Sequence, residues 1–241
     1  MDRVFDIHNH IMPGVDDGSK DMEMSLKMLR MARQEGITDV ILTPHNKPRH
    51  KNVTLPRMQE LVTSMEEAML AEGIDITLHL GNELYYHEAL EEWLEQGLAA
   101  TMCQSRYILL EFIPSHDWAY IEAAVHRMIN AGYIVIVAHV ERYDNVMSDM
   151  KRAAQLVEMG AYLQINAPSV MGEVDFKTKR HCKYLLKNGL VSFVATDAHE
   201  PVKRRPALRE CIRYIEKKYG SELCEDLFYI NPQKILHNEF I

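Results

Sequence analysis

The chain has 241 residues and a formal net charge of −8, with 27 Lys and Arg against 35 Asp and Glu. This acidic balance argues against a general nucleic-acid-binding surface, which needs an excess of Lys and Arg to neutralise phosphates. Hydrophobic residues make up 47% and charged residues 26%, which is typical of a globular protein with a substantial core and excludes general disorder.

Short apolar runs alternate with longer amphipathic stretches along the chain. The pattern predicts strands at 4–7, 39–43, 74–80, 107–112, 133–138, 161–165 and 191–195, and helices at 22–34, 56–72, 88–95, 118–130, 148–159, 176–188 and 207–219. Such alternation is typical of an α/β protein with a parallel sheet, either a closed barrel or an open, doubly wound sheet. No Gly-x-Gly-x-x-Gly follows the first strand, so we favour a (β/α) barrel, with seven strands rather than eight.

Polar side chains follow the predicted strands at their C-terminal ends, which form the active-site face of a parallel barrel. In chain order they are His8, His10 and Asp17, then His45, Glu83, Glu111, His139 with Arg142, Asn166, and finally Asp197 with His199. Taken singly, each is more often a hydrogen-bonded polar residue than a ligand. His8 and His10 share one face of their strand, however, and Asp197 and His199 form a similar pair on the last strand, its neighbour in a closed barrel. Together these residues predict a multinuclear metal site.

The donor set contains imidazoles and carboxylates without thiolate, which suits Mn²⁺, Fe²⁺ or Zn²⁺. The ligands exceed the demand of one ion, so we expect two or three ions that share a bridging carboxylate. Such clusters hydrolyse phosphate esters, because the ions lower the pKa of a bridging water and stabilise charge on the attacking and leaving oxygens. Arg142 is then expected to bind two phosphate oxygens.

Length and composition predict one domain over residues 1–241, since no linker or repeat divides the chain. The N-terminus shows no signal-peptide pattern, and the longest apolar runs are too short to cross a bilayer. Cysteines 103, 182, 211 and 224 form no CxxC pair. We therefore expect a cytoplasmic protein with reduced cysteines and no membrane insertion. The basic clusters at 47–51 and 203–205 are interpreted as solvated loops by default.

Seven motifs together resemble the polymerase and histidinol phosphatase (PHP) superfamily, and within it the bacterial capsule-regulating tyrosine-protein phosphatases of the CpsB/CapC/YwqE type. They lie at 6–10 (DIHNH), 15–18 (VDDG), 43–45 (TPH), 81–86 (GNELYY), 110–112 (LEF), 138–143 (AHVERY) and 196–199 (TDAH). The resemblance spans the chain, including YINPQKI at 229–235. It implies a distorted (β/α)₇ TIM-like barrel of PHP type and a metal-dependent protein-tyrosine phosphatase, a phosphoric monoester hydrolase that uses a metal-bound hydroxide. Its implied substrate is a cognate tyrosine autokinase that controls capsular or exopolysaccharide synthesis.

The resemblance also implies three divalent ions, characteristically Mn²⁺, with Fe²⁺, Zn²⁺ or Co²⁺ as alternatives. One ion takes His8, His10, Glu83 and Asp197; Glu83 bridges to a second ion held by Glu111 and His139; the third takes Asp17, His45 and His199. Arg142, Glu111, His139 and Asp197 form the expected catalytic set. Arg142 matches the phosphate-binding arginine of the family, and Arg205, ahead of Pro206, matches a second one, although the loop at 200–203 differs in spacing. Asp6 is expected to support the ligands without binding metal.

Three alternatives remain open from the residues. The same cluster serves a phosphatase for a small metabolite such as histidinol phosphate, or a phosphodiesterase. A non-catalytic metal-binding module that partners a kinase is a further alternative, although no ligand is missing. Tyr85 and Tyr86 either flank the substrate ring or pack at the barrel rim.

A thiolate mechanism is not expected. Tyrosine phosphatases with a nucleophilic cysteine carry Arg six residues after it, whereas Asn188 follows Cys182 at that spacing and no other cysteine meets the requirement. We therefore expect direct hydrolysis without a phosphoenzyme.

Overall fold

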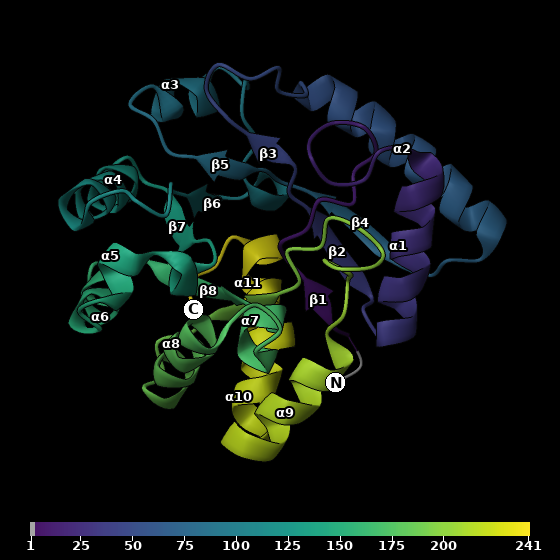
Figure 1. The fold of residues 1–241 in the computed structure, drawn as a ribbon. Coiled ribbons are helices and arrows are strands. Elements are labelled where there is room, and N and C mark those ends of the chain that lie inside the picture. Colours follow the sequence, from purple (N-terminus) through teal and green to yellow (C-terminus); the bar gives the residue numbers. More distant parts are fainter. Residues whose placement is uncertain (1–2) are drawn as a thin grey trace.

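The strands lie in the middle of the molecule and the helices surround them (Figure 1). This computed structural model describes residues 3–241. Every ladder between the described strands is parallel. The strands are β1 (Phe5–Asp6), β2 (Asp39–Leu42), β3 (His45–Asn46), β4 (Thr77–Leu80), β5 (Glu83–Tyr85), β6 (Tyr107–Glu111), β7 (Ile134–Val137), β8 (Tyr162–Asn166) and β9 (Phe193–Ala195).

Two positions of the barrel wall are each built from two short strands. β2 pairs with β1 and β4, and after a break at Thr43 and Pro44 the chain continues as β3, which pairs with β5. In the same way β4 continues as β5 after Gly81 and Asn82. The strands therefore occupy the seven positions that the sequence predicted, and the breaks distort the barrel. A Cβ on Gly81 would lie 3.3 Å from the Met102 Cα, so glycine allows the 3₁₀ turn η1 (Met102–Gln104) to pack close beside β4.

The first and last strands close the barrel. Asn9 and Ala198 form a parallel bridge just beyond β1 and β9. The His10 N–H donates to the Ala198 carbonyl at 2.8 Å, and the Asp197 N–H donates to the His8 carbonyl at 2.8 Å. This seam places the His8 and His10 pair beside the Asp197 and His199 pair.

The helices follow the strands in chain order, and most of them surround the barrel, whereas the last one lies at its centre in this view (Figure 1). They are α1 (Met22–Glu35), α2 (Leu55–Glu72), α3 (Leu90–Glu95), α4 (Trp118–Asn130), α5 (Asp144–Met147), α6 (Lys151–Glu158), α7 (Ala167–Met171), α8 (Phe176–Lys187), α9 (Arg209–Tyr219), α10 (Ser221–Glu225) and α11 (Asn231–His237), with a π-helical turn at Asp226–Ile230. Local sequence explains their ends. The Asp21 carboxylate accepts from the Met24 N–H at the start of α1, and Gly36 ends that helix with φ of 94°.

Apolar side chains fill the inside of the barrel, and the C-terminal segment covers its N-terminal end. Phe5, Tyr107, Ile136 and Phe193 are fully buried in one cluster, to which α11 contributes Ile235. The Tyr107 hydroxyl donates to the Glu239 carbonyl at 2.5 Å, which fixes this segment to the start of β6. Because the N-terminal end of the barrel is covered, ligands can enter only from the C-terminal end, where the polar motifs lie.

Among the helices that the structure describes, none combines the length and the apolar character needed to cross a bilayer.

Candidate metal centre

The predicted ligands gather at the C-terminal mouth of the barrel. Their donor atoms fall into four overlapping groups, each within 4.8 Å: His10, Asp17, His45 and His199; His8, His10 and Asp197; His8, Glu83 and His139; and His45, Glu83 and Glu111. All nine residues expected from the sequence are in these groups, which come from six of the seven wall positions and from the loop after β1. We divide the cluster by its contacts into a first lobe (His8, His10 and Asp197), a second lobe (Glu111 and His139) and a third lobe (Asp17, His45 and His199), with Glu83 in contact with all three.

Glu83 is the centre of the cluster, because its two oxygens contact four imidazoles. Oε1 lies 3.2 Å from His8 Nε2 and 2.9 Å from His139 Nε2. Oε2 lies 3.3 Å from His10 Nε2 and 2.8 Å from His45 Nδ1. The side chain is 1% exposed, so this carboxylate is shared between lobes rather than solvated.

Asp197 completes the first lobe and Glu111 the second. Asp197 Oδ1 lies 3.6 Å from His8 Nε2 and 3.5 Å from His10 Nε2. In the second lobe, Glu111 Oε1 lies 3.6 Å from His139 Nε2.

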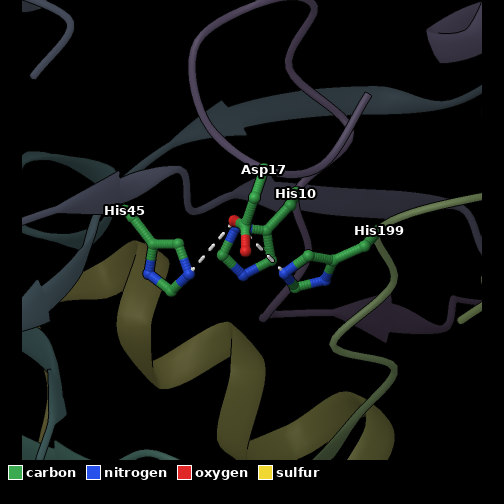
Figure 2. A group of neighbouring side chains, drawn as sticks. All are labelled: His10, Asp17, His45 and His199. Carbon is green, nitrogen blue, oxygen red and sulfur yellow. Dashed lines mark ion pairs between the residues drawn. The ribbon is translucent and has the colours of Figure 1, made fainter. Parts of the chain in front are cut away.

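The third lobe forms beneath the loop that follows β1. Figure 2 shows Asp17 reaching from this loop toward His45 and His199, with His10 beside them. Asp17 Oδ1 lies 3.4 Å from His45 Nε2 and 3.6 Å from His199 Nε2. Asp17 is 66% exposed, so this lobe forms the outer edge of the cluster.

Several donor atoms in the cluster are buried without a hydrogen-bond partner. Within residues 3–241 these include His8 Nε2, His10 Nε2, His45 Nδ1 and Glu111 Oε2. Orphaned buried nitrogens and oxygens are costly, and natural proteins rarely leave them unless an ion or water satisfies them. The residues therefore fit a group of divalent cations.

The electrostatics of the cluster also favour bound positive charge. Burial by itself raises the pKa of Glu83, but the neighbouring imidazoles of His8, His45, His10 and His139 hold it well below its usual range. Burial lowers the pKa of His139, yet hydrogen bonds to Glu111 and Glu83 raise it to about 10. The carboxylates thus retain protons on an imidazole that would otherwise be neutral, and metal cations would replace that positive charge.

Residues that the sequence did not single out orient the ligand rings. Gln164 Oε1 accepts from the His139 N–H at 2.7 Å and lies 3.1 Å from His8 Nδ1. An amide oxygen only accepts, so His8 Nδ1 carries the proton and Nε2 is left with a lone pair toward the site. Asp16 does the same for His10, with Oδ2 2.7 Å from Nδ1. Two features of the sequence could have pointed to these orienting residues: Gln164 is an amide two residues before Asn166, and Asp16 is adjacent to Asp17.

Asp6 and Asn166 hold Asp197 in place. Asp6 accepts from the Thr196 N–H at 2.9 Å and from its hydroxyl at 2.6 Å, so it faces the last strand rather than the cluster. The Asn166 amide donates to Asp197 Oδ2 at 2.8 Å and accepts from Gln164 Nε2 at 2.8 Å. Gln164 and Asn166 therefore link Asp197 to His8.

Local backbone geometry also serves the site. His139 and Asp197 both adopt left-handed conformations, with φ of 33° and 52°, where the barrel strands end. Such strain in residues other than glycine is typical of functional positions. Glycine is required at position 18 because of close packing. A Cβ there would lie 2.2 Å from the His10 carbonyl oxygen, so only glycine lets this loop pack against His10.

Two arginines contact Asp197 at the edge of the first lobe. Arg142 Nη1 lies 3.3 Å from Asp197 Oδ2, and Arg204 Nη2 lies 2.8 Å from the same atom. The sequence suggested Arg205 rather than Arg204 as the second arginine. Arg205 instead lines the adjoining cavity of about 560 Å³, together with Arg142 and Arg204, and its role stays a prediction.

The two tyrosines of the GNELYY motif lie in different surroundings. Tyr86 is buried with its ring centroid 5.9 Å from that of Phe112 and 5.5 Å from that of Tyr120, so it packs at the barrel rim. Tyr85 is half-buried, 6.5 Å from the His116 ring, and a contact with substrate stays a prediction. The four cysteines are unpaired, and none belongs to the ligand groups found in residues 3–241.

Comparison with known proteins finds relatives that match almost the whole chain. The family model for capsular polysaccharide synthesis, CpsB/CapC, matches residues 4–237. The tyrosine-protein phosphatase CpsB of Streptococcus pneumoniae is 31% identical over 99% of this chain and 100% of its own length. The tyrosine-protein phosphatase YwqE of Bacillus subtilis is 31% identical over 99% of this chain and 93% of its own.

Solved structures extend the comparison. Crystal structures of YwqE and CpsB, described as unique metal-dependent tyrosine phosphatases, include a chain that superposes with a TM-score of 0.92 at 31% identity, over 98% of this chain and 96% of that one. A phosphotriesterase from Mycobacterium tuberculosis superposes with a TM-score of 0.61 at 13% identity, over 99% of this chain and 95% of that one, which relates the folds alone.

Proposed function

Because the chain belongs to the CpsB/CapC family of capsular polysaccharide synthesis proteins, we propose that it is a metal-dependent protein-tyrosine phosphatase. The predicted family and fold class are thereby confirmed. The observation that carries the proposal is the set of orphaned imidazole and carboxylate atoms around Glu83, beside two arginines. Such a set suits phosphate monoesters, because cations and guanidinium groups together neutralise the phosphoryl oxygens.

The proposed cofactor is three divalent ions, and Mn²⁺ is the ion that we expect. His8, His10 and Asp197 face one lobe, Glu111 and His139 the second, and Asp17, His45 and His199 the third, with Glu83 shared. When bound, such ions supply hydroxide at neutral pH and stabilise charge on the attacking and leaving oxygens of the ester. Hard oxygen and imidazole donors without thiolate suit Mn²⁺, and Fe²⁺, Zn²⁺ and Co²⁺ are the alternatives.

The protein's own residues place the phosphate. Asp197 contacts His8 and His10 through Oδ1, and Arg142 and Arg204 through Oδ2. It therefore holds the arginine side chains at a fixed position next to the first lobe. Arg142 offers paired N–H donors to two phosphate oxygens, and Arg205 on the same cavity is the proposed second phosphate ligand.

The proposed substrate is a phosphotyrosine protein, and a cognate bacterial tyrosine kinase of polysaccharide export remains the expected one. The match to a family of capsular polysaccharide synthesis supports this assignment. One catalytic domain over residues 1–241 is proposed on the same support, since the family match runs from 4 to 237. Action in the cytoplasm stays a prediction.

The test is hydrolysis of p-nitrophenyl phosphate and phosphotyrosine peptides by the purified protein. We expect activity with Mn²⁺ and its loss after chelation, with recovery when Mn²⁺ is added back. Activity that survives thorough chelation would refute the metal-dependent mechanism. Turnover of histidinol phosphate equal to or faster than that of phosphotyrosine peptides would refute the tyrosine-phosphatase assignment.

A further inference from the structure

We propose that the cavity beside Asp197 is a docking groove for an acidic segment, with an apolar residue in it, that flanks the phosphotyrosine of the substrate protein. This inference rests on the proposed function and specifies the substrate class that the site selects.

The cavity adjoins the metal centre and extends away from it. It has a volume of about 560 Å³ and shares Asp197 and Arg142 with the first lobe. Its other walls come from α7, the loop after β9 and the start of α9. Chain that continues from a phosphotyrosine bound at Arg142 therefore has a cavity to enter, whereas a small metabolite would leave most of it unfilled.

The walls of the cavity carry excess positive charge, although the whole chain has a net charge of −8. Six basic residues line it, namely Arg142, Lys203, Arg204, Arg205, Arg209 and Arg213, against the four acidic residues Glu35, Glu173, Asp197 and Glu210. The cavity therefore provides a local positive potential for an anionic ligand.

Three of these cations have no ion-pair partner within residues 3–241. Arg142 and Arg204 are engaged by Asp197, and the Arg209 guanidinium donates to the Gln34 carbonyl. Lys203, Arg205 and Arg213 are exposed and form no ion pair within the described part of the chain. With Arg205 proposed for the reacting phosphate, Lys203 and Arg213 remain to bind carboxylates of the flanking segment.

Exposed apolar side chains accompany the positive charge. Val174 lines the cavity and is 58% exposed, Phe176 follows two residues later and is 81% exposed, and Val202 precedes Lys203 and is 72% exposed. They are among the five most exposed large hydrophobic residues of 3–241. Unburied apolar groups beside a charged cavity indicate a surface that a polypeptide covers.

The test compares substrates that differ only in their flanks. Phosphotyrosine peptides with Glu and Leu flanks, with neutral flanks and with Lys flanks are assayed beside p-nitrophenyl phosphate, with Mn²⁺ present. For the unmodified protein we expect kcat/KM for the acidic peptide to exceed that for the Lys peptide about tenfold, with a preference that declines as salt is added.

The variant Lys203→Glu/Arg213→Glu should remove or reverse this preference while hydrolysis of p-nitrophenyl phosphate stays within about twofold, because rim charges act on the encounter with a charged partner. Phe176→Ser should lower kcat/KM for the peptide with Glu and Leu flanks about threefold, because it removes the exposed apolar area that the Leu side chain would cover. The matched control is Lys51→Glu, which changes a basic residue in the second cavity, beside Asp17 and His45, and should keep the acidic preference.

Equal turnover of the three peptides by the unmodified protein, or a preference unchanged in the double variant, would overturn the docking groove and leave the phosphatase intact. Failure to hydrolyse even p-nitrophenyl phosphate with Mn²⁺ would overturn the proposed function itself, and the docking groove with it.

Discussion

Gln164 accepts a hydrogen bond from His8 Nδ1, at a distance of 3.1 Å between the nitrogen and Oε1. The same Oε1 accepts from the backbone N–H of His139 at 2.7 Å. One buried amide of β8 therefore fixes the tautomer of a proposed ligand just after β1 and the strained backbone of a proposed ligand after β7. Gln164 acts on the proposed ions through these residues and is a positioning residue.

Replacing Gln164 by Met should weaken metal binding. The change frees the His8 ring to turn or to change tautomer, and it leaves the His139 N–H buried without an acceptor. Loss of such an orienting partner typically costs ten- to a hundredfold in metal affinity, and we expect a decrease of about tenfold or more. Calorimetric titration of Mn²⁺ into the chelator-treated protein measures it. Gln59→Met on the exposed side of α2 is the control, and equal affinities in the two variants would contradict the role of Gln164.

Replacing Glu83 by Gln should abolish both metal binding and phosphatase activity. The carboxylate oxygens contact four imidazoles, and an amide supplies one weaker acceptor and a donor that repels a cation. Loss of a hydrogen-bond partner outside the ligand set already costs up to about a hundredfold in metal affinity. For Glu83→Gln we therefore expect metal affinity to fall at least about a hundredfold. Metal content by elemental analysis is read beside activity on p-nitrophenyl phosphate. A Glu83→Gln variant that keeps full metal content would show that Glu83 is not a shared ligand.

Replacing Gly18 by Ala should displace the loop that carries Asp16 and Asp17. The new Cβ would meet the His10 carbonyl oxygen at 2.2 Å and the His10 Cβ at 2.4 Å, and neither backbone can yield easily. We expect weaker binding of one ion, with the folded barrel retained, because the third lobe loses Asp17. Comparing metal stoichiometry and far-ultraviolet circular dichroism with those of Gly97→Ala, where the added Cβ meets nothing, separates the site from general strain. Full stoichiometry in Gly18→Ala would contradict the prediction.

Replacing Cys182 by Ser should leave phosphatase activity within about twofold, because thiolate chemistry requires a cysteine with a lowered pKa. Burial raises the pKa of the Cys182 thiol far above its usual range and raises that of Cys103 to about 12. Both cysteines therefore stay protonated at neutral pH. Iodoacetamide should also fail to inactivate the native protein. Inactivation that phosphate prevents would indicate a reactive cysteine in the site and contradict direct hydrolysis.

Asp39 should stabilise the fold above pH 4. Burial by itself raises its pKa, but hydrogen bonds from His79 and Arg3 lower it from 3.8 to about 2. A carboxyl group whose pKa is lowered on folding stabilises the protein above its unfolded pKa, and this contribution disappears as the pH falls from about 4 to about 2. Arg3 is 40% exposed, so we expect Asp39→Asn to cost about 1 kcal/mol at pH 7. Urea unfolding in chelator measures it, and a difference that stays constant down to pH 2 would contradict this assignment.

The sequence was most informative where one physical signal dominated. The helix predicted at 118–130 has the bounds of α4, because Ile121, Ala124, Val125 and Met128 form one buried stripe after Asp117. The strand predicted at 39–43 extends one residue beyond β2, and that at 133–138 extends one residue beyond each end of β7; the residues of both strands are all buried. Ligands could be proposed because strand ends in a parallel barrel converge.

The periodicity of hydrophobic residues could not predict short elements or tertiary contacts. β3 has two residues and β5 three, too few for a period, and α7 has five with Pro168 near its start. The role of Gln164 was not predicted, because it depends on His8, 156 residues away in the chain. The helix predicted at 148–159 begins at Lys151, because a separate short helix at Asp144–Met147 precedes it. The choice between Arg204 and Arg205 depends on how one loop turns, which residue spacing does not encode.

The seam between β1 and β9 also determines the order of events during synthesis. Asp6 receives its hydrogen bonds from Thr196, 190 residues later, and His8 and His10 share their lobe with Asp197. A nascent chain therefore carries His8 and His10 through the synthesis of the whole barrel before Asp197 exists, so the first lobe cannot form earlier. We expect a product truncated before Asp197 to lack phosphatase activity rather than to keep part of it.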